Sequence, residues 1–486
     1  MTGAEAVRSD DRRAVRALRT AAILLLLVLA CYSLTLANPG FFNHDEWQKY
    51  DHVARYGFAD FARAYGSLKA GPDFGFPVRP LGFLQQGFTG MWMGTRPFVP
   101  HLFDVLQHGL IAVLFAAVLA RAGLPRRTVG ASAVVFAVSP LATVSTGWVG
   151  ASFDRWYVGF SLVAAYGVVS QLRGLGARSS NFALVAAGMA LALLSKETAA
   201  VLPAALVLVA FAVWFRQGAD GRVALRAVLP QAALLVGVAG IPLLAYLGLR
   251  WPAIVASAHG EGGAYSPSLA NIPANALLYF AQPFYFGAVE LESAQSLPWG
   301  RLLFAVLAHA ALVAAFWRRY GTVDALLYLA AYAVFLLPVL PLHFAGAHYL
   351  YGSGVPFAAM VGLLLAPARD EAGGPAPRLA PLAMSVVLAM LGFRSLEIQL
   401  RMYDHGVCEN RFLNTYLPEA RAEIRHGAAA VQLVVDPGAM GYVAERSLFG
   451  REQFSAGGEI PSVVGGVPGP GMARLHMGSD CRVRPE

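Results

Sequence analysis

The chain is built from a series of long apolar runs, separated by short segments that carry arginine. A membrane-spanning helix needs about 20 apolar residues, and only structures that bond every backbone polar group internally can cross a bilayer. Only 14% of the 486 residues are charged, and the mean hydropathy is +0.54, whereas soluble domains carry about 25% charged residues. The sequence therefore predicts an all-α polytopic membrane protein.

Arginine marks one side of the predicted membrane domain. Of 37 basic residues, 34 are arginine and three are lysine, and arginine in short loops is typical of the cytoplasmic side. The net charge of +8 comes from these loops, so we do not expect a nucleic-acid partner. The expected spans, about eleven in all, cover residues 20–36, 98–120, 129–148, 156–172, two runs within 181–215, 227–249, 302–317, 323–340, 350–366 and 379–396.

The first run fixes the expected orientation. Five arginines precede it, so residues 1–19 are expected to form a basic cytoplasmic N-terminus. A cleaved signal peptide ending near Thr35-Leu36-Ala37 is the alternative. We take the run as an uncleaved span of a bacterial inner-membrane protein whose next loop, residues 38–97, is long and extracytoplasmic.

Two apolar stretches do not fit one full span. Residues 181–215 are too long for one crossing and have arginines at both ends, so we expect two short spans that meet at an outer turn, Ser195-Lys196-Glu197-Thr198. If residues 274–289 crossed the membrane, Arg318 and Arg319 would lie outside. We therefore expect 274–289 to be interfacial or re-entrant.

The domain organisation follows from polarity. Residues 20–396 form the predicted transmembrane domain, and residues 397–486, of ordinary polarity, are expected to form a small extracytoplasmic α+β domain. In that domain, Pro418 is expected to open a helix, and Ala430–Asp436 is typical of a strand.

Two of the three cysteines, Cys408 and Cys481, lie in the C-terminal domain, and Cys31 lies in the first span. Spacing alone does not identify a disulfide. An extracytoplasmic location makes a Cys408–Cys481 bridge plausible, because disulfides persist in oxidising compartments.

Adjacent carboxylates, Asp45 and Glu46, open the first outer loop and are followed by Trp47. A carboxylate at a wet membrane surface can accept the proton of an attacking hydroxyl or bind a divalent cation such as Mg²⁺ or Mn²⁺. The alternative is an acidic N-cap for the amphipathic stretch Glu46–Tyr65. Two consecutive acids exceed what capping needs, so we interpret them as catalytic candidates.

Charged residues of later loops are expected on the same side. Asp154-Arg155 lies in the second outer loop, where a simple ion pair that joins this loop to another loop is the alternative to a functional role. The three lysines all fall in segments placed outside, and Lys196 sits between two apolar runs, where an unpaired ammonium is costly. We expect Lys196 to neutralise a lipid phosphate; the alternative is a simple partner for Glu197.

Three polar residues, His101, Asp104 and His108, share one face of the second span by helical spacing. They could bind a metal, but a hydrogen-bonded polar seam between helices is the commoner arrangement. Arg79 and His348 add cationic groups to the outer side. Aromatic rings that could stack on a sugar, or form an aromatic belt, are Trp47, Tyr349 and Tyr351.

In this order, the motifs resemble the C-type glycosyltransferases, most closely the membrane half of the tetratricopeptide-containing O-mannosyltransferases. Asp45-Glu46 resembles their acidic loop motif and Val78-Arg79-Pro80-Leu81 their Tyr-Arg-Pro-Leu element. Further likenesses cover His101-Leu102 through His108, Pro140 through Asp154, Leu194-Ser195-Lys196-Glu197-Thr198 with Pro203, and His348-Tyr349-Leu350-Tyr351.

The resemblance covers about residues 20–366 and implies transfer of a sugar from a polyprenyl-phosphate carrier to a hydroxyl. It implies that Asp45, or Glu46 in its place, is the base, and that Lys196 acts at the carrier phosphate. The chain departs from the family pattern at Val144, where a glutamate is usual, and at His348, where an arginine is usual. The tetratricopeptide half has no counterpart.

The sequence thus predicts an inverting glycosyltransferase that acts on the outer face of the inner membrane. The predicted acceptor of the sugar is a hydroxyl of a glycan, a lipid or a protein. Two alternatives stay open at this point: a lipid-linked glycan polymerase or ligase, and a transporter or flippase without chemistry. Transporters place polar residues near the midplane and often contain repeated halves, whereas here the unusual charges gather at one face.

Overall fold

The computed structural model describes residues 3–42, 44–66, 79–93, 96–218, 225–258, 267–289, 297–365, 379–449, 460–466 and 469–486. The helices are α1 Gly3–Cys31, α2 Ser33–Leu36, α3 His44–Tyr56, α4 Phe58–Tyr65, α5 Pro80–Met93, α6 Phe98–Arg121, α7 Arg126–Ala137, α8 Pro140–Gly147, η1 Val149–Ala151, α9 Ser152–Leu172, α10 Arg178–Leu193, η2 Glu197–Val201, α11 Leu202–Gly218, α12 Leu225–Ala258, η3 Leu269–Asn271, α13 Ile272–Ala281, η4 Gln282–Phe284, α14 Trp299–Tyr320, α15 Thr322–Val334, η6 Ala347–Tyr351, α16 Gly354–Leu365, α17 Leu379–Arg425 and α18 Gly441–Phe449. The strands are β1 Ala430–Val435, β2 Ser462–Val464, β3 Met472–Met477 and β4 Val483–Pro485.

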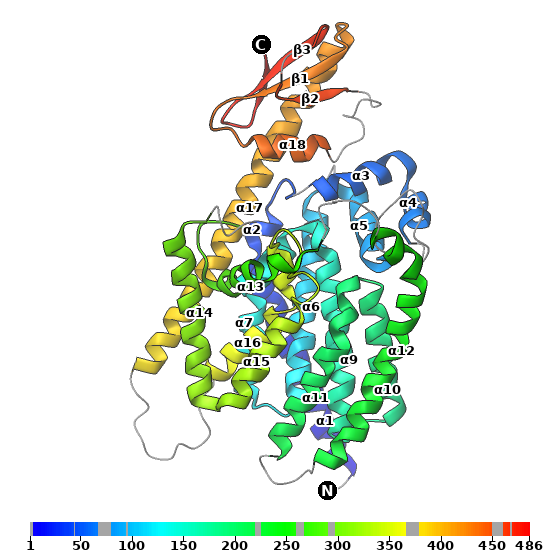
Figure 1. Ribbon diagram of the computed structural model, residues 1–486, viewed down its shortest axis with the longest axis vertical. Helices are drawn as coiled ribbons and strands as arrows, with labels where there is room; N and C mark the ends of the chain where they lie inside the picture. The colour runs from blue at the N-terminus through cyan, green and yellow to red at the C-terminus, as the bar shows by residue number, and fades with distance from the viewer. Residues whose placement is uncertain are drawn as a thin grey trace.

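The helices form one elongated bundle with a small sheet at one end (Figure 1). The N-terminus lies at the opposite end of the bundle from the sheet, and α3, α4 and α5 cover the end that faces the sheet. Large apolar side chains such as Leu110, Ile241 and Leu307 point out of the bundle and are 60%, 69% and 58% exposed. Lipid tails solvate such side chains without cost, so the fold class, an all-α polytopic membrane protein, is confirmed.

Within the described residues, four helices are long and apolar enough to cross a membrane: Phe98–Arg121, Glu197–Arg216, Val228–Trp251 and Trp299–Tyr320. A fifth span results if α7 and α8 are counted as one, although they are bent by 48°. The bend lies at Ser139-Pro140, where Ser139 caps α8 through Leu141 N and Pro140 occupies its first turn. Shorter apolar helices accompany them, and the count of about eleven spans stays a prediction.

Residues 181–215 have the expected local form, and the interfacial or re-entrant position of residues 274–289 stays a prediction. Residues 181–215 are divided into α10 and α11, with the chain turning at Ser195-Lys196 before η2. The segment around 274–289 contains α13, of only ten residues, and η4. Asn275 Nδ2 of α13 donates to the carbonyls of Leu340 and Leu342, so this short helix is held by the end of the α15 region. It is too short to span a bilayer.

Helix α17 joins the bundle to the C-terminal domain without a break over 47 residues (Figure 1). The expected boundary between residues 396 and 397 therefore falls inside a helix. Pro418 lies within α17 and does not open a new helix, which corrects that expectation. A proline inside a helix removes one hydrogen bond and usually kinks or breaks the helix, but α17 continues past Pro418 to Arg425.

The sheet has the order β2-β1-β3-β4, with β2 and β3 parallel to β1 and β4 antiparallel to β3. The expected strand at Ala430–Asp436 corresponds to β1. Its residues Val431 and Leu433 are fully buried against α17 side chains, among them Phe412 and Tyr416. The small sheet thus shares one hydrophobic core with the upper half of α17.

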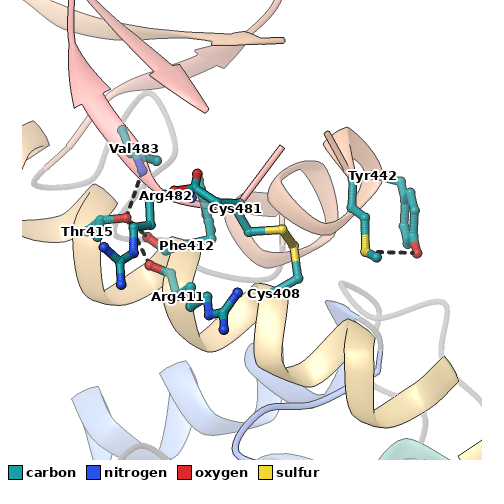
Figure 2. The surroundings of a disulfide bond; sticks show 10 residues. Cys408, Arg411, Phe412, Thr415, Tyr442, Cys481, Arg482 and Val483 are labelled. Atoms are coloured by element: carbon teal, nitrogen blue, oxygen red, sulfur yellow. Dashed lines mark hydrogen bonds between the residues drawn. A yellow bond between two sulfur atoms is a disulfide. The ribbon is translucent and has the colours of Figure 1, made fainter. Parts of the chain in front are cut away.

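A disulfide joins Cys408 of α17 to Cys481 in the turn before β4, with 5.2 Å between the Cα atoms (Figure 2). Close to it, the N–H of Val483 donates to Thr415 Oγ1 at 2.9 Å, so two links hold β4 against α17. The bridge closes 73 residues of chain, and closing a long loop restricts the unfolded state.

We expect Cys481→Ser to lower the free energy of unfolding of the C-terminal domain by about 2–4 kcal/mol. Thermal melting of the purified protein, with and without a reducing agent, measures this. Cys31→Ser is the matched control, because Cys31 is unpaired in α1. An unchanged melting temperature after reduction of the wild-type protein would contradict the prediction.

Candidate active site

Helix α3 begins at His44, so Asp45 lies in its first turn. The side chain of Asp45 lies outside the described residues. Glu46 is buried, and its Oε2 accepts from Phe42 N at 2.9 Å while its Oε1 accepts from Val149 N at 2.8 Å. Glu46 therefore ties the first loop to η1 in the second loop, and its two oxygens already hold backbone amides.

Trp47 is buried at the junction between α3 and the C-terminal domain. Its indole Nε1 donates to Glu409 Oε1 of α17 at 2.6 Å, and its ring packs edge-on against Phe41. This position differs from the expected one at a sugar surface, because the hydrogen-bonding end of the indole is directed at α17. Its role toward a ligand stays a prediction.

Lys196 lies at the turn between α10 and α11 and is 3% exposed. Its Nζ contacts Asp154 Oδ1 at 2.5 Å and lies 4.5 Å from the ring centre of Tyr349. Burial lowers the pKa of Lys196, the charge of Asp154 opposes this shift, and the charge of Arg79 adds to it. Lys196, Asp154 and Tyr349, which are far apart in the sequence, form one cluster.

A second ion pair lies next to this cluster. Arg79 donates through Nε to Glu197 Oε2 at 2.7 Å and through Nη2 to Glu197 Oε1, which is a two-pronged contact. Its guanidinium lies 5.0 Å from the ring centre of Phe153. The alternative in which Lys196 simply pairs with Glu197 is therefore wrong: Glu197 binds Arg79, and Lys196 binds Asp154.

His348 lies in η6 beside Trp148, with 4.7 Å between the ring centres. The hydroxyl of Ser145 donates to the carbonyl of His348 at 2.9 Å, which holds η6 against α8. Tyr349, the next residue, lies against Lys196. The loop with His348 and Tyr349 therefore reaches the same end of the bundle as the Lys196 turn.

The polar residues of α6 form hydrogen bonds between elements. His101 Nε2 contacts the carbonyl of Gly40 at 3.0 Å, and His108 contacts the Tyr351 hydroxyl at 2.8 Å and the Ala137 carbonyl at 3.1 Å. Tyr351 is fully buried in this seam, so it does not provide the ring surface for a sugar that we expected.

The charged centre of the seam is a buried ion pair between Asp104 of α6 and Arg155 of α9. Arg155 also donates to Gln107 Oε1 at 2.9 Å, and Gln85 donates to Asp104 Oδ1 at 3.0 Å. The expected ion pairs between segments are present: Asp154 pairs with Lys196, and Arg155 pairs with Asp104. Adjacent residues at the start of a helix point in different directions. Asp154 therefore faces Lys196, while Arg155 faces the interior of the bundle.

No group of three or more His, Cys, Asp or Glu side chains among the described residues could hold a metal ion. The histidines of α6 are engaged in the contacts above. Because Asp45 lies outside the described side chains, the divalent cation stays a prediction.

Most of the candidate residues thus lie at the end of the bundle that faces the sheet. Sequence reasoning missed two partners, Glu197 for Arg79 and Glu409 for Trp47. Glu197 carried a signal, since a carboxylate between apolar runs needs a partner. Glu409 carried none, because a glutamate in a polar helix is ordinary.

No family model matches the chain, and no curated protein matches it. The solved structures that it resembles include arabinofuranosyltransferase AftD from mycobacteria, with a TM-score of 0.47 and 17% identity over 92% of this chain. ArnT from Cupriavidus metallidurans in the apo state has a TM-score of 0.48 and 13% identity over 92% of this chain. Oligosaccharyltransferase AglB from Archaeoglobus fulgidus has a TM-score of 0.44 and 11% identity over 90%.

The chain covers 31% of AftD, 64% of AglB and 85% of ArnT. At this sequence distance the likeness concerns the fold alone. The narrower resemblance to O-mannosyltransferases stays a prediction. The solved structures to which the chain is similar thus include AftD, AglB and ArnT.

Proposed function

We propose that this protein transfers a sugar from a polyprenyl-phosphate carrier to a hydroxyl acceptor at the outer face of the bacterial inner membrane. The observation that carries the proposal is the Lys196–Asp154–Tyr349 cluster, which joins a buried cation, a carboxylate and an aromatic ring at one end of the bundle. Asp45 lies in the first turn of α3 at the same end. A phosphate leaving group needs a cation, and an attacking hydroxyl needs a base.

An apolar cavity below this cluster supports a lipid-linked donor. Its volume is about 690 Å³, and α6, α9, α11, α15 and α16 line it. Val158, Leu202 and Val355 are among its lining residues and follow Asp154, Lys196 and Tyr351 by four to six positions. A carrier whose phosphate contacts Lys196 would place its isoprenoid chain against this apolar wall.

A second apolar cavity, of about 650 Å³, lies between α5, α6 and α9 next to Trp156. This second cavity offers the isoprenoid chain of the donor another path along the bundle. Both cavities are lined mainly by apolar side chains, and the first also has Arg173, Arg216 and Asp324 in its lining. The apolar part suits an isoprenoid rather than a free nucleotide sugar.

The proposed chemistry is one displacement at the anomeric carbon. Asp45 takes the proton of the acceptor hydroxyl, the new glycosidic bond forms, and the carrier phosphate leaves toward Lys196, with Arg79 and His348 nearby. A single displacement inverts the anomeric centre. The disulfide at Cys408–Cys481 supports placing this end of the bundle outside the cytoplasm, since disulfides form in oxidising compartments.

The test uses the full-length protein in lipid nanodiscs with a panel of synthetic undecaprenyl-phosphate monosaccharides. Envelope fractions of a strain that lacks the gene supply the acceptor. We expect release of undecaprenyl phosphate and label in the envelope fraction with one donor. Label transferred only from a long lipid-linked glycan would favour the polymerase or ligase, and donor movement without bond cleavage would favour a flippase.

Lys196→Ala is expected to lower kcat/KM for the donor by about 10²–10³-fold, because it removes a preorganised charge at the leaving phosphate. Lys196→Arg should recover part of the loss, since it keeps the charge but not the compact ammonium. Lys69→Ala, in the first loop and not at the turn that contains Lys196, is the control. Wild-type donor kinetics in Lys196→Ala would remove Lys196 from the phosphate site.

A further inference from the structure

A buried carboxylate of α17, Glu409, contacts three groups from two other parts of the chain. Its Oε2 accepts from Phe41 N at 2.6 Å, and its Oε1 accepts from Trp47 Nε1 at 2.6 Å and from Ser447 Oγ of α18 at 3.0 Å. Hydrogen bonds to an ionised carboxylate are short and about twice as strong as neutral ones. Phe41 and Trp47 lie on either side of Asp45 in the sequence.

Further contacts extend from the same face of α17 to the segment before Asp45. Asn38 Nδ2 donates to the Met402 carbonyl at 3.1 Å, and Asn410 Nδ2 donates to the Pro39 carbonyl at 3.2 Å. Residues 402, 406, 409 and 410 share one helix face. The first loop therefore lies along α17 over several residues and is not attached at one point only.

Two glycines allow this close approach. A Cβ added at Gly40 would lie 2.4 Å from the carbonyl oxygen of Gly406, and one added at Gly406 would overlap the Asn38 side chain. The backbone of residues 38–41 thus runs directly against α17. This spacing brings Phe41 N within reach of Glu409.

From these contacts we propose that Glu409 is a positioning residue that holds Phe41 and Trp47 and thereby sets the place of Asp45 between them. The inference rests on the proposed function, in which Asp45 is the base. Glu46 holds the same segment from the side of η1, through Phe42 N and Val149 N. The two carboxylates leave Asp45 between two fixed backbone points, and the C-terminal domain becomes part of the support of the active site.

Glu409→Gln tests the proposal with little change in size. The amide nitrogen of glutamine is a donor, so it meets Phe41 N–H or Trp47 Nε1–H without an acceptor. Because a shift of about 1 Å in a reacting group costs about 100-fold, we expect kcat to fall about 10–100-fold. KM for the undecaprenyl-phosphate donor should stay within about twofold of wild type, because Lys196 is untouched.

Hydrogen exchange gives a readout that does not depend on activity. In Glu409→Gln, the peptide containing Phe41 should exchange at least about tenfold faster, while peptides of α9 keep the wild-type rate. Glu419→Gln, ten residues further along α17, is the matched control and should show neither effect. Ser447→Ala removes only the contact to α18 and should give a smaller fall in kcat.

Each outcome of these experiments supports or overturns the inference. Wild-type kcat and wild-type exchange in Glu409→Gln would overturn the inference while leaving the proposed function intact. If Glu409→Gln fails to fold, Ser447→Ala together with Trp47→Phe takes its place, and wild-type kcat in both would overturn it. No donor cleavage by the wild-type protein would instead refute the proposed function, and faster exchange at Phe41 would still support the structural part.

Discussion

Replacing Asp45 by asparagine is expected to lower the rate of sugar transfer by about 10²–10⁴-fold, because the amide cannot accept the proton of the acceptor hydroxyl. The measurement is release of undecaprenyl phosphate by the nanodisc-embedded variant with its preferred donor. Binding of the donor should change little, since its phosphate is expected at Lys196.

Asp60→Asn is the matched control, because Asp60 lies on α4 and its carboxylate pairs with Arg63 and His52. Glu46→Gln separates the two candidate bases. Glu46 holds the amides of Phe42 and Val149, so its variant should lose stability as well as activity. Full activity in Asp45→Asn with none in a folded Glu46→Gln would transfer the base role to Glu46.

The second large effect is expected at the buried pair of Asp104 and Arg155. Asp104→Leu leaves the guanidinium of Arg155 without its carboxylate inside the bundle, and removing one partner of such a pair costs about 3–5 kcal/mol. We expect a strong fall in the melting temperature of the detergent-purified protein, with lower yield in the membrane.

The double variant Asp104→Leu with Arg155→Met distinguishes the causes. It removes both charges, so it should recover most of the stability that the single variant loses. If the double variant is as unstable as the sum of both single variants, then the contacts to Gln85 and Gln107, and not the unpaired charge, explain the loss.

The local predictions succeeded where a short stretch of sequence contains the whole cause. The turn at Ser195-Lys196 follows from the length of the run at 181–215 and from the arginines at its ends. Helix α13 has only ten residues and is shorter than the apolar stretch 274–289 that it overlaps. The boundary at 396/397 followed a change in polarity, but α17 crosses it, because a helix continues as long as its backbone bonds and packing allow.

In the candidate site, too, local sequence identified unusual residues but did not identify their partners. Lys196 was identified because an unpaired ammonium between apolar runs is costly. Its partner, however, is Asp154 and not its neighbour Glu197. Trp47 and Tyr351 looked like sugar-binding aromatics, and both are buried in hydrogen-bonded positions. An aromatic residue in a loop looks the same in the sequence whether its ring faces a ligand or a helix.

By itself, the sequence determined that the chain is a membrane-embedded helical protein, where several of its apolar helices lie, among them α6, and which charges are unusual. These properties depend on the polarity of neighbouring residues and on the thickness of a bilayer. Only the tertiary structure decided which charges meet: Lys196 with Asp154, Arg79 with Glu197, Asp104 with Arg155, and Glu409 with the loop around Asp45. Each pairing depends on the rotation and register of helices that pack against each other, and these follow from contacts across the whole bundle.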